Sequence, residues 1–110
     1  MSETKTVYIA GPMSGLPEFN YPAFDAAEVS LKERGYLTLN PTASEIENTD
    51  TAYQQKPWDW YLRRAIRMVT EADGMALLPG WENSKGATLE RTIALALGLD
   101  VRRLRDWMRT

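Results

Sequence analysis

The chain has 110 residues, of which 44% are hydrophobic and 25% are charged, a balance that predicts a single globular domain over residues 1–110. Its formal charge of −2 disfavours duplex nucleic acid or an anionic membrane as the main partner, because both attract proteins with a cationic excess. It has neither cysteine nor histidine, which excludes a disulfide framework, a thiolate nucleophile and a histidine general base.

The first 39 residues predict two strands and one helix. An apolar, β-branched run over residues 6–10, stopped by Gly11-Pro12, indicates a buried strand. Residues 13–20 are predicted to be irregular, and Asn20 is the expected N-cap of a helix with Pro22 in its first turn. A second strand is predicted over residues 36–39.

The second half of the chain begins with a polar stretch over residues 42–57. Connections in α/β units are usually much shorter, so this stretch is predicted to be a flap. The further predicted elements, in chain order, are a helix over 58–72, a strand over 74–78, a helix over 86–97, a brief strand over 99–101 and a short basic helix or frayed end over 102–110.

Alternation of strands and helices predicts an α/β fold with right-handed crossovers. The simplest arrangement is a small flavodoxin-like or Rossmann-like parallel sheet with strand order 2-1-3-4 and helices on both faces. Such sheets bind ligands beyond the carboxyl ends of their strands, at the switch point between strands one and three. Gly11-Pro12 and Pro79-Gly80 follow those two strands, so a ligand site is expected beside them.

Glu90 is the most informative residue for chemistry. Ile93, Ala94 and Leu97 follow it at helical spacing, so its carboxylate is predicted to share the face that packs on the sheet. An inward carboxylate in a cleft is a candidate nucleophile or base. The alternative is an acid that only complements the dipole at the start of its helix.

Tyr8 is a second candidate. A strand tyrosine near the switch point can donate its hydroxyl to a carboxylate across the crevice and hold that carboxylate in place. The alternative is ordinary core packing, which is the usual role of aromatic residues in strands.

Two glycine-containing segments are candidate anion sites. The loop Gly11-Pro12-Met13-Ser14-Gly15 follows a strand and offers backbone N–H groups and the Ser14 hydroxyl, although it matches neither GxGxxG nor a Walker A motif and is alternatively a simple turn. Ser84, Gly86 and Ala87 open the last long helix, where Ser84 is alternatively only an N-cap.

The tryptophans and arginines offer further ligand contacts. Trp81, just past Pro79-Gly80, is predicted to stack on a planar base, whereas Trp58, Trp60 and Trp107 are predicted to serve packing or interfaces. A cationic helix edge is most commonly a solvated face, and contact with phosphate is the alternative; its members are Arg63, Arg64 and Arg67.

These residues together resemble a known family. The blocks Tyr8–Met13, Asn20–Phe24 and Ala76–Glu90 look like the nucleoside 2-deoxyribosyltransferase-like superfamily, and more closely the small DUF4406 proteins often carried by bacteriophages and prophages. The resemblance spans Val7 to about Val101.

The resemblance implies roles for the candidate residues. Glu90 attacks the anomeric carbon and forms a glycosyl-enzyme, which water or a second base resolves, as in a retaining glycosidase. Tyr8 orients Glu90, and the segments matching residues 11–15 and 84–87 hold the sugar or its 5′-phosphate.

Ala65 departs from the family pattern. Relatives commonly have Tyr-(Leu/Met)-Arg-x-Asp-Ile-Arg on the helix before strand three, and the stretch Tyr61–Arg67 places Ala65 at the aspartate position. Asp59, six residues earlier, is not an obvious substitute. Without an acid to protonate the leaving base, turnover is expected to fall by ~10²–10⁴-fold.

The sequence therefore predicts a nucleoside or nucleoside 5′-monophosphate N-glycosidase or deoxyribosyltransferase-like enzyme that needs no metal or organic cofactor. The alternatives are a catalytically weakened nucleotide-binding or sequestering phage protein and a protein-interaction module that uses its tryptophans. A chain this short buries only part of its surface, so a homodimer or higher homo-oligomer is expected. A cytoplasmic location without a membrane partner is expected, because no signal-peptide core or ~20-residue apolar span is visible.

Overall fold

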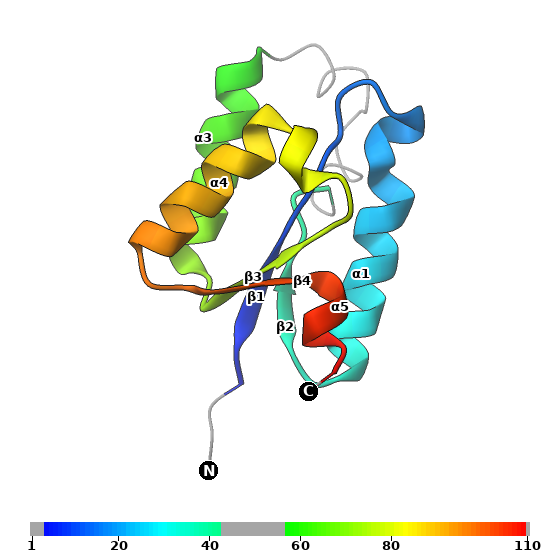
Figure 1. The fold of residues 1–110 in the computed structure, drawn as a ribbon, viewed down its shortest axis with the longest axis vertical. Coiled ribbons are helices and arrows are strands. Elements are labelled where there is room, and N and C mark those ends of the chain that lie inside the picture. The colour runs from blue at the N-terminus through cyan, green and yellow to red at the C-terminus, as the bar shows by residue number, and fades with distance from the viewer. Residues whose placement is uncertain (1–3, 43–56, 110) are drawn as a thin grey trace.

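The structure is a computed structural model that describes residues 4–42 and 57–109. In these residues a parallel sheet has the strand order β2-β1-β3-β4 (Figure 1). The strands are β1 (Thr6–Ala10), β2 (Leu37–Leu39), β3 (Gly74–Leu77) and β4 (Asp100–Arg103). Tyr8 lies opposite Leu39 on one side and Met75 on the other. The predicted α/β class and the order 2-1-3-4 are confirmed.

Helices cover both faces of the sheet (Figure 1). One face carries α1 (Tyr21–Glu33) and α5 (Leu104–Trp107), and the other carries α3 (Trp58–Glu71) and α4 (Lys85–Ala96). Two short 3₁₀ turns, η1 (Pro17–Asn20) and η3 (Trp81–Asn83), precede α1 and α4. No helix in the described ranges combines the length and apolar character that a bilayer crossing requires.

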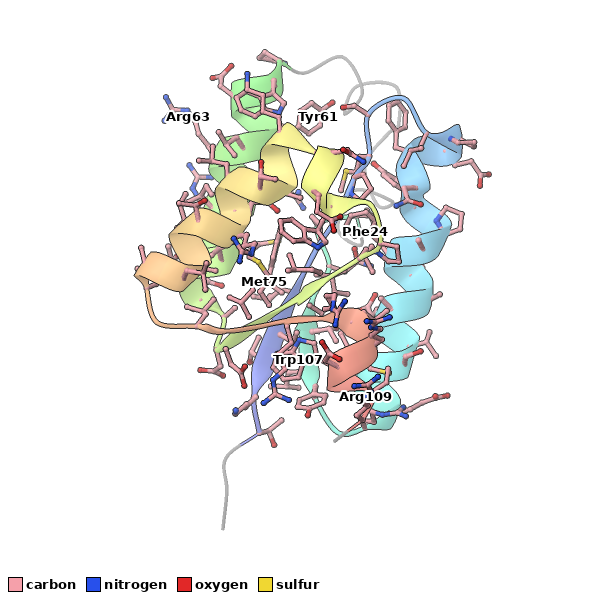
Figure 2. The ribbon with its side chains drawn as sticks, viewed as in Figure 1. Phe24, Tyr61, Arg63, Met75, Trp107 and Arg109 are labelled. Atoms are coloured by element: carbon pink, nitrogen blue, oxygen red, sulfur yellow. The ribbon has the colours of Figure 1, made fainter. Side chains whose placement is uncertain are left out.

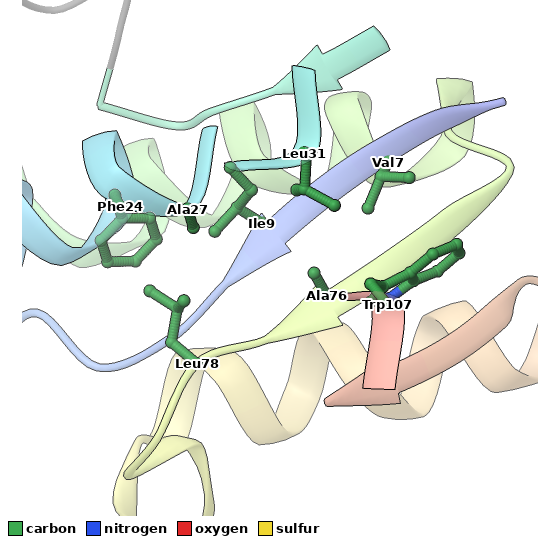
Figure 3. Close-up of a cluster of buried hydrophobic side chains, with 8 residues drawn as sticks. All are labelled: Val7, Ile9, Phe24, Ala27, Leu31, Ala76, Leu78 and Trp107. Carbon is green, nitrogen blue, oxygen red and sulfur yellow. The ribbon is translucent and has the colours of Figure 1, made fainter. Parts of the chain in front are cut away.

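The core beneath α1 and α5 explains the position of the C-terminal segment. The Trp107 indole N–H donates a hydrogen bond to the Met75 carbonyl oxygen at 2.9 Å, and the ring meets Tyr36 edge to face. Residues 104–107 therefore form a short helix that places Trp107 in the core, rather than a frayed end. Figure 3 shows the cluster that Trp107 completes, formed by Val7, Ile9, Phe24, Ala27, Leu31, Ala76, Leu78 and Trp107.

A second core lies beneath α3 and α4. Successive strand side chains point to opposite faces of a sheet, so Tyr8 and Ala10 face these helices while Val7 and Ile9 face α1. The fully or largely buried members are Tyr8, Ala10, Ala65, Val69, Ala72, Met75, Leu77 and Ala94. The orientation of Tyr8 places it on the same side as α4.

The segment between β1 and α1 differs from the prediction. Glu18, Phe19 and Asn20 form part of a 3₁₀ turn with φ values of 53°, 53° and 63°. Asn20 does precede α1, but its side chain donates to the Pro12 carbonyl oxygen at 3.0 Å and makes no capping bond. A capping side chain needs an extended backbone at that residue, and the left-handed backbone of Asn20 turns its side chain away.

Two other expectations change at the ends of elements. Arg102 and Arg103 belong to β4 instead of the C-terminal helix, because they pair with Ala76 and Leu77 of β3. The predicted flap over 42–57 lies almost entirely outside the described residues.

Candidate active site

A cavity of about 740 Å³ opens at the predicted switch point, beyond the carboxyl ends of β1 and β3. Its walls come from the loop after β1, the beginning of α1, the N-terminal half of α3 and the beginning of α4. Ligand pockets for small molecules typically have volumes of roughly 300–1,000 Å³. The cavity therefore has room for a ligand of nucleotide size.

Glu90 lies in the wall of this cavity, with only 9% of the residue exposed. Burial raises the pKa of the carboxyl group from its usual 4.5 to about 8, and a hydrogen bond with the Tyr8 side chain opposes part of that rise. Without a ligand the group is therefore mostly protonated at neutral pH. The structure thus brings together the carboxyl group and the tyrosine that the sequence analysis selected separately.

The loop after β1 contributes four of its five predicted residues to the cavity wall. Gly11, Pro12, Met13 and Ser14 line the cavity, whereas Gly15 does not. A Cβ atom at Gly11 would lie 2.8 Å from the Leu78 Cβ, so a side chain there would collide with the segment that follows β3. Glycine allows the two strand ends to approach closely at the cavity.

The start of α4 forms the opposite wall. Ser84, Lys85, Gly86 and Ala87 all line the cavity, and the Ser84 hydroxyl accepts a hydrogen bond from the Ala87 N–H at 3.1 Å. Ser84 therefore both caps the N-terminus of α4 and lines the cavity. The first N–H groups of a helix have no partner within it, which leaves those of Lys85 and Gly86 beside the cavity.

The structure places Trp81 beside the core and not among the residues that line the cavity. Its ring packs on the core beneath α3 and α4, and the Arg91 guanidinium lies 5.0 Å from the ring centre. When the Trp81 indole packs on apolar core side chains, more of its surface is removed from water than if it lay in the wall of an open cavity.

Trp58 lines the cavity in its place. Trp58, Leu62 and Ala65 recur at helical spacing, and all three face the cavity. The helical spacing in the sequence therefore indicated that Trp58 shares a face with Leu62 and Ala65. Only the fold shows that this face of α3 contacts a cavity as well as the core.

Ala65 and Arg64 define the α3 wall. Ala65 is 7% exposed and lines the cavity, so the position where relatives have an acid does face the candidate site. Arg64 also lines the cavity, and its guanidinium donates to the Pro41 carbonyl oxygen at 3.2 Å.

The other charged residues of α3 lie elsewhere. Figure 2 shows Tyr61 directed toward the segment after β1 and Arg63 pointing away from the body of the protein. Arg63 pairs with Asp59 at 3.8 Å, and both side chains are at least 70% exposed. Asp59 is therefore turned outward, away from the cavity that Ala65 lines. Arg67 is exposed and is not part of the wall.

The described part of the cavity wall is cationic in balance. Arg64 and Lys85 are its basic residues, and Glu90 is its carboxyl group. Within residues 4–42 and 57–109, no group of three or more aspartate or glutamate side chains is arranged to hold a metal ion.

Comparisons with known proteins agree with this architecture. A family model described as "Domain of unknown function (DUF4406)" matches residues 5–103. A solved structure described as "2-desoxiribosyltransferase from Leishmania mexicana" has the same fold, with a TM-score of 0.66 and 21% sequence identity. The alignment covers 90% of this chain but only 63% of that one. No curated protein matches the sequence.

Proposed function

The chain belongs to the DUF4406 family, and from this premise we propose that it is an N-glycosidase or deoxyribosyltransferase-like enzyme acting on a nucleoside or nucleoside 5′-monophosphate. One observation carries the proposal: a buried carboxyl group, hydrogen-bonded to a tyrosine, faces a cavity at the switch point of a deoxyribosyltransferase-like sheet. Glu90 is the proposed nucleophile, and Tyr8 orients it.

The reaction begins when Glu90 has lost its proton to solvent, and the ionised Glu90 oxygen then attacks the anomeric carbon of the sugar. The C–O ester bond forms as the C–N bond breaks, and the base leaves with the bonding electrons. Water or a second base then attacks the same carbon and releases the carboxylate. Ala65 supplies no proton, so the departing base takes one from solvent.

The proposed substrate contacts follow from the cavity wall. The N–H groups of Lys85 and Gly86 and the loop of Gly11–Ser14 hold the sugar or its phosphate, because N–H groups at a helix start attract anions. Arg64 and Lys85 add positive charge to the same cavity. This charge favours a nucleoside monophosphate over an uncharged nucleoside.

The test is release of free base from a panel of nucleosides and nucleoside monophosphates, followed by chromatography. Glu90→Gln is expected to abolish release, because the amide cannot form the ester. Tyr8→Phe is expected to reduce release, and exposed Glu82→Gln is the matched control. Unchanged release by Glu90→Gln would overturn the assignment of the nucleophile.

Ala65 favours a second candidate, a catalytically weakened nucleotide-binding or sequestering protein. In that case calorimetry detects nucleotide binding while chromatography detects no released base. Ala65→Asp is then expected to raise turnover by ~10²-fold or more if only the acid was lost, with Ala65→Asn as the size-matched control. Tight binding without turnover in wild type and Ala65→Asp alike would favour the binding protein.

A further inference from the structure

Trp58 is an exposed aromatic residue in the wall of the candidate site. It is the first residue of α3, and 45% of it is accessible to solvent. One and two turns later, Leu62 and Ala65 line the same cavity. The indole therefore extends the cavity-facing side of α3 out to the mouth.

The neighbouring tryptophan provides a contrast. Trp60 is half-buried and packs edge to face on Tyr61 at a centroid distance of 5.2 Å, and it is absent from the cavity wall. Covering an exposed indole by a ligand lowers the free energy, because apolar surface is removed from water. Of the two tryptophans, Trp58 is the one with exposed apolar surface that a ligand can cover.

Lys85 joins Trp58 to the start of α4. Its ammonium nitrogen lies 4.6 Å from the centre of the Trp58 ring, within the range of a cation–π contact. Lys85 is the first residue of α4, so the contact links the starts of the two helices that flank the cavity. The indole is thereby held beside the N–H groups proposed to bind the sugar or phosphate.

We propose that Trp58 is the surface on which the nucleobase stacks, and that Lys85 is a positioning residue that orients the indole. The proposal rests on the proposed function for its class of ligand. Every nucleobase has a flat aromatic face, and stacking on tryptophan needs no hydrogen-bond match. Sugar binding at the start of α4 and base stacking at the start of α3 together place one nucleotide across the cavity.

The experiment measures dissociation constants by calorimetry in the full chain, with Glu90→Gln as the background to prevent turnover. The ligands are deoxyadenosine 5′-monophosphate and deoxyribose 5-phosphate, which differ at the anomeric carbon: the first carries the base there and the second a hydroxyl group. Trp58→Ala is expected to weaken binding of the nucleotide roughly tenfold or more and to leave binding of the sugar phosphate unchanged. Trp58→Phe is expected to keep most of the affinity, and Trp60→Ala is the matched control.

Lys85 is tested by a double-mutant comparison. Lys85→Met is expected to increase the ratio of the nucleotide to the sugar-phosphate dissociation constant when Trp58 is present and to leave that ratio unchanged in Trp58→Ala. A role of Lys85 confined to the phosphate changes both ligands equally and overturns its positioning role.

The outcomes separate this inference from the proposed function. Nucleotide affinity that is unchanged in Trp58→Ala, or equal weakening of both ligands, overturns the stacking role alone. Base-dependent loss in Trp58→Ala, together with no release of base by the wild type, supports the stacking role and overturns the proposed catalysis. If the unsubstituted chain binds no nucleotide, both proposals fall.

Discussion

Glu90 combines three properties that rarely coincide in a carboxylic acid: deep burial, a tyrosine hydrogen-bond partner and a place in a cavity wall. A buried carboxylate is costly, because the protein interior solvates charge less well than water. The hydrogen bond with Tyr8 does not offset this cost, and the pKa stays raised. Such groups concentrate at functional sites.

The raised pKa predicts how stability depends on pH. The unfolded chain releases the Glu90 proton near pH 4.5, whereas the folded chain keeps it until about pH 8. The contribution of this group is thus fully present below pH 4.5 and is lost as the pH rises toward 8. Over that window we expect the free energy of unfolding to fall by roughly 1 kcal/mol per pH unit.

Urea denaturation of the wild type and Glu90→Gln from pH 5 to pH 9 measures this dependence. Glu90→Gln lacks the titrating group, so its stability relative to the wild type should increase with pH up to about 8 and level off above it. Exposed Glu82→Gln should follow the wild type. Parallel curves for all three proteins would contradict the burial of an uncharged Glu90.

At the scale of elements, the site depends on how closely β1 approaches the segment after β3. Gly11 lies at that approach, where an added Cβ would meet the Leu78 side chain at 2.8 Å. An added Cβ at Gly86, in the first turn of α4, would meet no other segment of the described residues within 4 Å. The two glycines therefore have opposite steric surroundings in one cavity wall.

Gly11→Ala is expected to destabilise the protein by about 1–3 kcal/mol, because the strand ends must separate. Gly86→Ala is expected to stabilise it by up to about 1 kcal/mol, because alanine loses less backbone freedom in a helix. Thermal or urea denaturation of each variant and the wild type measures these changes in stability. Equal effects of the two substitutions would show that the packing at Gly11 is not tight.

At the scale of the whole molecule, α5 joins the C-terminal segment to the centre of the sheet. The Trp107 side chain lies where a Cβ on Gly74 would be only 2.7 Å away, so the indole occupies the space above that glycine. Its N–H bonds to Met75, and the Arg102 guanidinium lies 4.7 Å from its ring. The last described residues are thus a structural part of the domain.

Trp107→Ala is expected to reduce the free energy of unfolding by about 3–5 kcal/mol, because it leaves a large cavity and removes the hydrogen bond to the Met75 carbonyl oxygen. Trp58→Ala, at a residue with 45% exposure, is the control and should cost much less. Chemical denaturation measures the free energy of unfolding of both variants and the wild type. Similar losses in both variants would contradict the role of α5 in the core.

Self-association and a cytoplasmic location remain predictions from the sequence. Apolar side chains on the surface of the described residues, including Val29, Leu37 and Leu97, are each more than half exposed. Sedimentation analysis of the full chain tests the predicted homo-oligomer.

Much of the fold followed from the sequence because its signals are local. Strand and helix periodicity, the stops at Gly11-Pro12 and Pro79-Gly80 and the right-handedness of crossovers together predicted the strand order. The spacing of Glu90 from Ala94 likewise indicated an inward carboxyl group, since residues four apart share a helix face.

Only the tertiary structure decided which side chains share the cavity. Trp81 turned to cover a core and Trp58 met Lys85 across the cavity mouth, and neither contact has a sequence period because the partners lie on different elements. The same holds for Trp107, whose partner Met75 is 32 residues away. Local periodicity specifies the face of an element, whereas the neighbour of that face depends on packing among elements distant in sequence.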